Sequence, residues 1–223
     1  MSNNKVIPML FNTEMVNALL EGRKTQTRRP IKFPVRYSHE SGFSFMDKKE
    51  KWWACGAGFK YSDTVKNFVC PKAPWQIGDL IYVRETHHRS HTGVVTYRAD
   101  SGIDPFSEDC GEDCSMFGEK WIPSIHMPRS ASRITLKVTG VRVEQVQAIT
   151  KEDATAEGFF DEPAAEGMDW KLGAKHNFKF TWSRTYKNWN ENPWVWVIEF
   201  EVIKQNVNDY LEVAPWVFQS LSS

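Results

Sequence analysis

Hydrophobic and polar positions recur along the chain in patterns that predict several strands and two short helices. The apolar stretch from Val6 to Phe11 is typical of a buried strand. Apolar residues at helical spacing follow it, with Asn12-Thr13 as the cap and Gly22 as the terminating residue, so we expect a helix from about 13 to 21. Alternating apolar side chains predict further strands at 80–85, from Ile134 to Val143 and from Trp194 to Val202.

A second short helix is predicted to begin at Lys151. Thr150 stands at the capping position, Ile149 precedes it as the hydrophobic residue that often packs back on the first turn, and Asp153 follows three residues after the cap. Gly158 comes soon afterwards, so the helix must be short. Glu157 would therefore sit in its last turn.

The remaining segments lose this periodicity, which indicates insertions in a small framework. We interpret the stretches at about 33–74, 99–130 and 159–192 as long loop insertions, and residues 205–223 as a C-terminal tail with little pattern. Strands separated by two short helices indicate the α+β class. The expected architecture is a small mixed β-barrel or curled sheet with short flanking helices, in one domain over residues 1–204.

Composition narrows the classes of function. The 223 residues carry 28 Lys and Arg against 28 Asp and Glu, so a long electrostatic track for duplex nucleic acid is not expected. No apolar run approaches the roughly 18 residues of a membrane span, and the N-terminus lacks a signal pattern, which predicts a cytoplasmic protein without a membrane partner. The 30 aromatic residues supply a core and leave some for stacking on a base, for which Trp52, Trp53, Trp75 and Trp121 in irregular segments are candidates.

Charge is unevenly distributed along the chain despite the balanced total. Six Lys and Arg and no carboxylate lie between Gly22 and His39, whereas residues 99–119 hold seven carboxylates and no Lys or Arg. The zero net charge is thus partly a cancellation, which leaves room for a small positive cleft.

The cysteine and histidine patterns favour the absence of a metal. Cys110 and Cys114 are spaced as in a metal loop, and Cys55 with Cys70 could complete four ligands, but the second pair is widely spaced. Four reduced thiols are the favoured interpretation. His87, His88 and His91 cluster without a paired carboxylate or Cys motif and are read as surface residues, so neither metal nor cofactor is expected.

The densest chemical signal is the run from Gly22 to Pro30, where hydroxyls alternate with cations. A Thr near a Lys of lowered pKa can act as a nucleophile or position a water. In a regular strand Lys24 and Thr27 would point to opposite faces, so a joint role requires a turn or bulge after Gly22. A solvated basic turn is the alternative.

Four segments in this order resemble the ASCH domain, a branch of the PUA-like fold. They are G-R-K-T-Q-T-R-R at 22–29, G-D-L-I-Y-V-R-E at 78–85, I-T-K-E-D-A-T-A-E-G at 149–158 and W-V-W-V-I-E-F-E-V at 194–202. The segment order and P-S-I-H-M-P-R at 123–129 are most similar to ASCH proteins encoded by phages and prophages. The resemblance spans about residues 6 to 204 and leaves the insertions unmatched.

The resemblance implies an amidohydrolase that removes the acetyl group from N4-acetylcytidine. Small bacterial members use a Lys and a Thr of a G-x-K-T-x-T segment and a Glu, which fall here on Lys24, Thr27 and Glu157. Glu157 at the carbonyl end of its helix lies where the dipole disfavours negative charge, and a carboxylic acid there can pass a proton to a leaving amine. In the resulting hypothesis Lys24 activates Thr27, Thr27 attacks the acyl carbon and Glu157 protonates N4.

Other polar residues are expected to bind the substrate. They are Arg23, Arg28, Arg29, Arg84, Glu85, Ser132 and Arg133. Arg84 and Glu85 alternate on a strand, so one of them should reach the pocket, and we expect it to be Glu85.

Two alternatives remain open from the sequence. A module that binds RNA or a modified nucleotide without chemistry would use the same cleft, and a ribonuclease would depend on Arg28, Arg29 and Arg133 more than on Glu157.

Overall fold

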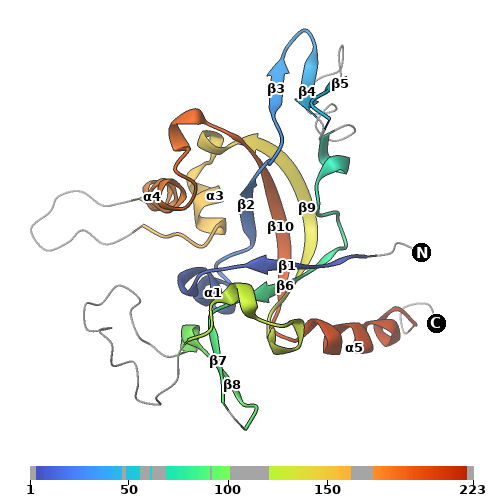
Figure 1. Cartoon of the computed structure of the whole chain (residues 1–223), viewed down its shortest axis with the longest axis vertical. Coiled ribbons are helices and arrows are strands. Elements are labelled where there is room, and N and C mark those ends of the chain that lie inside the picture. The colour runs from blue at the N-terminus through green and yellow to red at the C-terminus, as the bar shows by residue number, and fades with distance from the viewer. Residues whose placement is uncertain are drawn as a thin grey trace, which may run out of the picture. The chain divides into compact units, whose positions relative to one another are not determined.

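The protein is a mixed α+β molecule in which strands predominate in the described part (Figure 1). This confirms the predicted class. The computed structural model describes residues 4–46, 49–55, 61, 69–90, 92–100, 121–161 and 173–219, without the side chains of Cys55 and of residues 214–219.

The chain forms two compact units, each assembled from segments that are distant in sequence. The first unit comprises Met1–Gly22, Asp79–Lys137 and Val202–Ser223, and the second comprises Arg23–Gly78 and Val138–Glu201. Two long strands, β9 (Thr135–Gln145) and β10 (Trp194–Ile203), begin in one unit and end in the other.

The first unit is built around a parallel strand pair. β1 (Val6–Leu10) pairs with β6 (Leu80–Arg84), and the first residues of β9 pair with β6 from the other side. The other elements of this unit are α1 (Thr13–Leu20), β7 (His87–Arg89), β8 (Val95–Tyr97) and α5 (Val207–Gln219).

The N-terminal elements confirm the sequence-based expectation. The Asn12 side chain accepts a hydrogen bond of 2.9 Å from the backbone N–H of Met15, which satisfies one of the free donors of the first turn of α1. Gly22 follows the helix with φ at +77°, a conformation that favours glycine.

The second unit places two helices against a three-stranded antiparallel region. β2 (Gln26–Pro30) pairs with β10, and β10 lies beside β9. α3 (Lys151–Ala156) and α4 (Ala174–Tyr186) pack together on one side of these strands. The core between them consists of Val146, Ile149, Ala154, Ala174, Phe178, Trp182, Val195 and Val197.

A separate small sheet also belongs to the second unit. β3 (Val35–Ser38), β4 (Gly42–Met46) and β5 (Trp52–Cys55) form an antiparallel sheet at the top of Figure 1. A short 3-10 helix, η2 (Cys70–Lys72), follows in sequence. This small sheet therefore occupies part of the segment 33–74 for which the sequence predicted an irregular insertion.

Helices also lie in two other segments for which the sequence predicted no element. The segment 159–192 contains the 13-residue helix α4, whose buried residues Ala174, Phe178 and Trp182 recur every four positions. The predicted tail 205–223 contains α5, where Asn206 accepts a hydrogen bond from the N–H of Asn208 at the helix start. Of the insertion at 99–130, residues 101–120 lie outside the described residues.

Candidate functional site

A buried ion pair joins two of the four segments on which the resemblance rests, 22–29 and 149–158. The Lys24 ammonium donates hydrogen bonds of 2.9 Å to Oε2 of Glu157 and 2.7 Å to the Glu157 carbonyl oxygen. The two side chains are only 1% and 4% exposed. The structure therefore brings together two of the three predicted catalytic residues, which are separated by 133 positions in the sequence.

Local structure explains how the pair is positioned. Lys24 precedes β2 and forms an isolated antiparallel bridge with Glu157. Thr150 caps α3 as predicted, because its hydroxyl accepts a hydrogen bond of 3.1 Å from the N–H of Asp153. Glu157 is the C-terminal cap of this short helix, and Gly158 follows with φ at +97°. The capped helix thus holds the Glu157 carboxylate against the start of β2.

Burial lowers the pKa of Lys24. Removal from water disfavours the charged ammonium, and the charges of Arg29 and Arg28 act in the same direction, while contact with Glu157 only partly opposes them. A lysine in such a position gives up its proton more readily than one in water, which is the property a general base requires.

Arg28 connects this pair to two further carboxylates. One terminal nitrogen lies 3.2 Å from Glu157 Oε1, and the other lies 2.9 Å from both Glu144 and Asp153. The Arg28 side chain is fully buried, and its Nε has no hydrogen-bond partner among the described residues. An unpartnered buried donor is rare and often marks a place where a ligand or water is bound.

Asp153 anchors the opposite side of the same network. Its carboxylate lies 2.9 Å from a terminal nitrogen of Arg142 and accepts a hydrogen bond of 3.1 Å from Gln26. Arg142 also contacts Glu144 at 2.6 Å and makes a close ion pair with Glu199. The result is a continuous network of three cations and four carboxylates: Lys24, Arg28, Arg142, Glu144, Asp153, Glu157 and Glu199.

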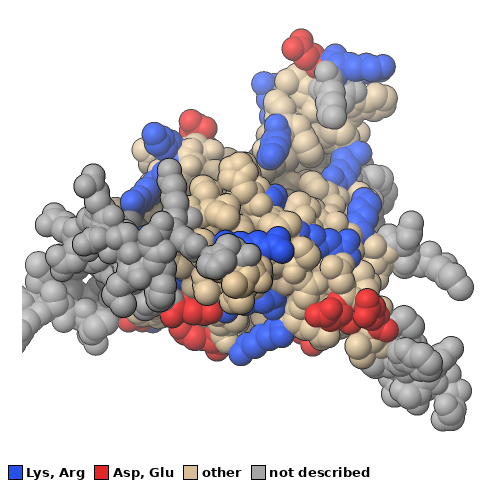
Figure 2. Space-filling view, turned by 60° about the horizontal axis from the view of Figure 1, so that its bottom comes forward, with Lys and Arg blue, Asp and Glu red and all other residues tan. Residues whose placement is uncertain are grey.

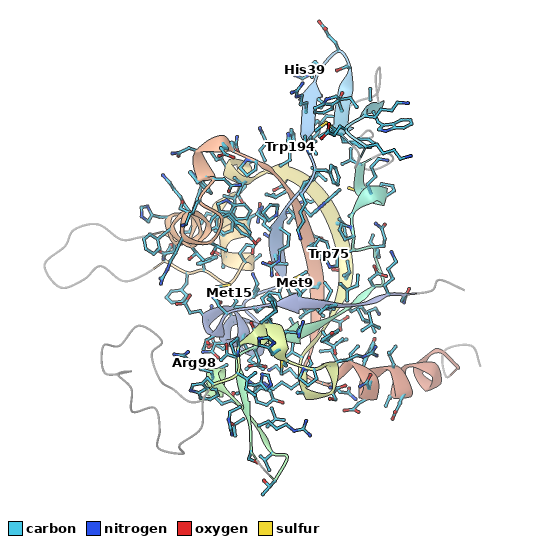
Figure 3. The ribbon with its side chains drawn as sticks, viewed as in Figure 1. Met9, Met15, His39, Trp75, Arg98 and Trp194 are labelled. Carbon is cyan, nitrogen blue, oxygen red and sulfur yellow. The ribbon has the colours of Figure 1, made fainter. Side chains whose placement is uncertain are left out.

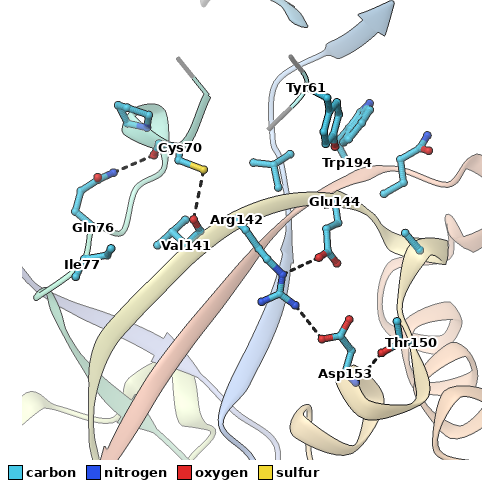
Figure 4. A pocket seen from close by; sticks show the side chains of 14 residues that line it. Tyr61, Cys70, Gln76, Ile77, Val141, Arg142, Glu144, Thr150, Asp153 and Trp194 are labelled. Carbon is cyan, nitrogen blue, oxygen red and sulfur yellow. Dashed lines mark hydrogen bonds and ion pairs between the residues drawn. The ribbon is translucent and has the colours of Figure 1, made fainter. Parts of the chain in front are cut away.

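A cavity of about 770 Å³ lies beside this network (Figure 4). Its polar floor comes from Arg142, Glu144 and Asp153, and the aromatic side chains of Tyr61 and Trp194 form one wall. Trp194, which Figure 3 labels, stands at the start of β10 below the small sheet. The lining also includes Cys70, Pro71, Gln76, Ile77, Val141, Val143, Gln145, Ala148 and Thr150.

Two lining residues are held in their neutral forms. Burial, reinforced by the charge of Glu144, raises the pKa of Tyr61 to about 12. Burial also raises the pKa of the Cys70 thiol, which donates a hydrogen bond of 3.4 Å to the Val141 carbonyl oxygen. These groups offer the cavity a hydroxyl and an uncharged thiol rather than additional negative charge.

The predicted nucleophile lies on the other face of β2. Thr27 pairs with Ile198, whereas its neighbours Gln26 and Arg28 both contact Asp153 of α3. Because side chains alternate along a strand, Thr27 points away from the side that carries Lys24 and Glu157. The turn at Gly22 lies before Lys24 and does not change this order.

Two predicted binding residues flank the buried pair within the second unit. Arg23 donates a 2.7 Å hydrogen bond to the Gly158 carbonyl oxygen and lies 5.4 Å from the ring centre of Phe160. Arg29 donates a 3.3 Å hydrogen bond to the Tyr186 hydroxyl on α4. Both guanidinium groups therefore hold the local structure around Lys24.

The other four predicted binding residues, Arg84, Glu85, Ser132 and Arg133, lie in the first unit, where Glu85 and Arg133 contact each other. Arg133 donates two 3.0 Å hydrogen bonds to the buried Glu85 and also contacts Asp100 at 2.7 Å. Burial raises the pKa of Glu85, although Arg133 opposes this effect. Ser132 donates to the Val83 carbonyl oxygen at 2.9 Å.

Arg84 has a structural contact on the opposite face from Glu85. It donates to the carbonyl oxygens of Met127, at 2.8 Å, and Ile125. Arg84 thereby holds the segment that carries P-S-I-H-M-P-R against β6.

Three members of the network, Arg142, Glu144 and Glu199, were not predicted from the sequence, and neither was Gln26, which contacts it. A signal was present, because Lys24, Gln26 and Arg28 occupy every second position, as do Arg142 and Glu144 in β9. Polar residues at alternate positions of strands with buried neighbours indicate a polar cluster on one face. Asp153 was read as a capping residue, and its side chain instead points to the strands.

The cysteine and histidine predictions lie partly outside the described residues, and the prediction that His87 lies at the surface is wrong, because this residue is only 3% exposed. Cys110, Cys114 and His91 are not among the described residues. Within the described part, no cluster of His, Cys, Asp and Glu suited to a metal ion is found.

We expect replacement of Asp153 by Asn to reduce the loss of stability in acid. Burial alone would raise the pKa of Asp153, but Gln26, Arg28 and Arg142 outweigh it and hold that pKa below its ordinary 3.8. The carboxylate therefore contributes stability that is fully present above about pH 3.8 and is lost as pH falls through the folded-state pKa.

Urea unfolding of D153N and wild type at pH 7 and pH 3 measures this contribution. The difference in unfolding free energy between the two pH values should be smaller for D153N. E201Q, which alters an exposed carboxylate on β10, should behave as wild type. Equal acid sensitivity of D153N and wild type would contradict the assignment.

Comparison with known proteins identifies no relative. The chain matches no family model, no curated protein and no solved structure. Across the described residues, every helix is too short or too polar to cross a membrane.

Proposed function

We propose that the chain is a PUA-like protein of the ASCH type that hydrolyses the acyl group of N4-acetylcytidine or a similar modified nucleoside. The observation that carries this proposal is the 2.9 Å contact between the buried Lys24 ammonium and Glu157. These residues stand at the positions where the resemblance implies a catalytic Lys and Glu. The lowered pKa of Lys24 supports its use as a base.

The contacts support the following chemistry. Neutral Lys24 takes the proton of the attacking oxygen, and its contact with Glu157 provides a path for that proton to the leaving N4 atom. The bond between the acyl carbon and N4 then breaks, and cytidine leaves with the proton on N4. Attack by water yields the carboxylic acid directly, whereas attack by Thr27 yields a threonine ester that a water then hydrolyses to the acid. The unpartnered Nε of Arg28 is a donor available to the developing oxyanion.

The attacking oxygen comes from Thr27 or from water. Thr27 lies on the opposite face of β2 from Gln26 and Arg28, which favours water. The T27A variant separates the two, because loss of activity identifies the hydroxyl and full activity identifies water.

Incubation with N4-acetylcytidine tests the proposal. We expect purified protein to release cytidine and acetate without added metal, as measured by chromatography. E157Q should release cytidine at least about 100-fold more slowly, since it removes a proton-transfer group. The exposed-site variant E201Q is the control. Absence of turnover by the folded wild-type protein would contradict the proposal.

A non-catalytic binding module is the second candidate. The observation that favours it is that Arg142, Glu144 and Asp153 line the cavity, whereas Lys24 and Glu157 do not. Such a module would bind N4-acetylcytidine without turnover, which equilibrium dialysis in the same experiment detects.

The ribonuclease alternative receives less support. It depends on cations that bind phosphate, but Arg28 is surrounded by three carboxylates and Arg133 contacts Glu85 and Asp100. Both guanidinium groups are therefore already compensated.

A further inference from the structure

The small sheet presents an aromatic face that leads to the cavity. Strand register places Tyr37 opposite Phe43, and Phe45 opposite Trp53. Opposite residues of paired strands share a face, as do residues two positions apart, so these four rings lie on one side of the sheet.

This face is buried at one end and exposed at the other. The ring of Phe43 lies 5.1 Å from that of Trp194 and 5.5 Å from that of Tyr61, the two aromatic residues of the cavity wall. Trp53, in contrast, is 47% exposed. The aromatic side chains thus extend from the cavity to an exposed tryptophan.

Cations accompany the aromatic rings. Nζ of Lys51 lies 4.6 Å from the Trp53 ring centre, and Nζ of Lys72 lies 4.2 Å from the Phe45 ring centre. Lys72 belongs to η2, whose Cys70 and Pro71 line the cavity. On the other face of the sheet Arg36 stacks on Trp52 at 4.4 Å. Figure 2 shows several Lys and Arg side chains where this sheet projects.

This combination matches the chemistry of single-stranded nucleic acid. Exposed aromatic rings stack on unpaired bases, and adjacent Lys and Arg side chains contact the phosphates. The cavity of about 770 Å³ has room for one nucleoside, with Trp194 as a stacking surface. Glu144 and Asp153 can accept hydrogen bonds from an amino group of that base, and Arg142 can donate to its carbonyl oxygen.

We propose that the aromatic face of the β3–β5 sheet binds single-stranded RNA, with one nucleotide in the cavity and its neighbours on Phe45 and Trp53. The choice of RNA over DNA rests on the proposed function, which acts on a ribonucleoside. The stacking and charge arguments do not depend on that function. A duplex is excluded as the partner because its bases are already stacked on one another. The cavity would then accept a cytidine residue within a strand as well as the free nucleoside.

Fluorescence anisotropy with a labelled ten-nucleotide single-stranded RNA containing cytidine tests this surface on the full chain. We expect binding that weakens with salt. W53A should bind about tenfold more weakly, since it removes a stacking ring. A K51Q/K72Q double variant should reduce the slope of log Kd against log salt by about 1.4, since each phosphate contact with a single strand contributes about 0.7.

Two matched variants control for nonspecific effects. F180A removes an aromatic side chain that is 63% exposed on α4, and K204Q removes an exposed cation at the end of β10. Both should bind RNA as wild type does. Circular dichroism checks the fold of W53A, and the double variant alters two exposed cations, so it tests the surface even if W53A is unstable.

The outcomes also separate this proposal from the proposed function. RNA binding that depends on Trp53, Lys51 and Lys72 supports the surface even if N4-acetylcytidine is not hydrolysed. No RNA binding at low salt, or equal losses in the control variants, would overturn it. Equal affinity for duplex RNA would overturn the stacking mode, and equal affinity for DNA of the same sequence would overturn the choice of RNA.

Discussion

The E157Q variant is expected to unfold with a free energy about 3–5 kcal/mol lower than that of wild type, the cost of breaking a buried ion pair from one side. The Lys24 ammonium would keep its buried position but face a neutral amide, and Arg28 would lose one of its three carboxylate partners. Neither cation can recover its hydration without local unfolding, because the two side chains are 1% and 0% exposed. Urea unfolding at pH 7 measures the difference.

Two comparisons establish that the pair itself is responsible. E201Q removes an exposed carboxylate on β10 and should change stability by less than about 0.5 kcal/mol. The double variant K24M/E157Q should lose less stability than the two single variants together, because the second change removes the charge that the first leaves uncompensated. A loss below about 1 kcal/mol in E157Q would show that water reaches the pair and would contradict its buried character.

Features that depend on neighbouring residues could be predicted from the sequence. The Asn12 cap, the positive φ of Gly22 and the Thr150 cap of α3 all involve residues within four positions of one another. Such signals can be recognised because the residues that interact in the structure are also close together in the sequence. The pairing of Lys24 with Glu157 spans 133 positions and was predictable only through the resemblance.

The small sheet and the last helix were missed for different reasons. In β3 to β5 the aromatic residues fall on both faces, as with Trp52 and Trp53, so polar and apolar positions do not alternate. In α5 the capping residue Asn206 forms a start signal, and Val207, Tyr210, Leu211 and Ala214 recur at helical spacing. Pro215 follows inside this pattern, and a proline in a helix interior argues against a helix in the sequence. Periodicity does not reveal the strands of the small sheet, because aromatic rings and long side chains on both faces can be partly buried and partly exposed.

The structure also changes the interpretation of the charge distribution. The cations of the basic run from 22 to 29 do not form an open positive cleft, because Lys24 and Arg28 are buried and paired with carboxylates of the same unit. Exposed positive charge lies instead on the small sheet and η2, at Arg36, Lys51 and Lys72. Arg28, which the sequence predicted to bind substrate, thus stabilises the structure of the site. The accessible cations belong to the segment 33–74.

Replacement of Lys24 by Met is expected to lower kcat for N4-acetylcytidine hydrolysis by about 10²–10⁴-fold, the usual contribution of a positioned general base. Met preserves most of the length of the buried side chain but cannot accept a proton, so the effect should appear in kcat more than in KM. K175M, which alters an exposed lysine on α4, is the matched control and should retain wild-type kcat.

The pH dependence distinguishes a base from a residue that only shapes the site. Because burial lowers the pKa of Lys24, the neutral amine is the major form above a pH that is lower than the ordinary 10.5. The rate of the wild-type protein should therefore rise with pH and level off below pH 10.5. The residual activity of K24M should lack this rise. If K24M retained both wild-type kcat and the rise, another group would have to accept the proton, and Lys24 would serve only to hold Glu157 in place.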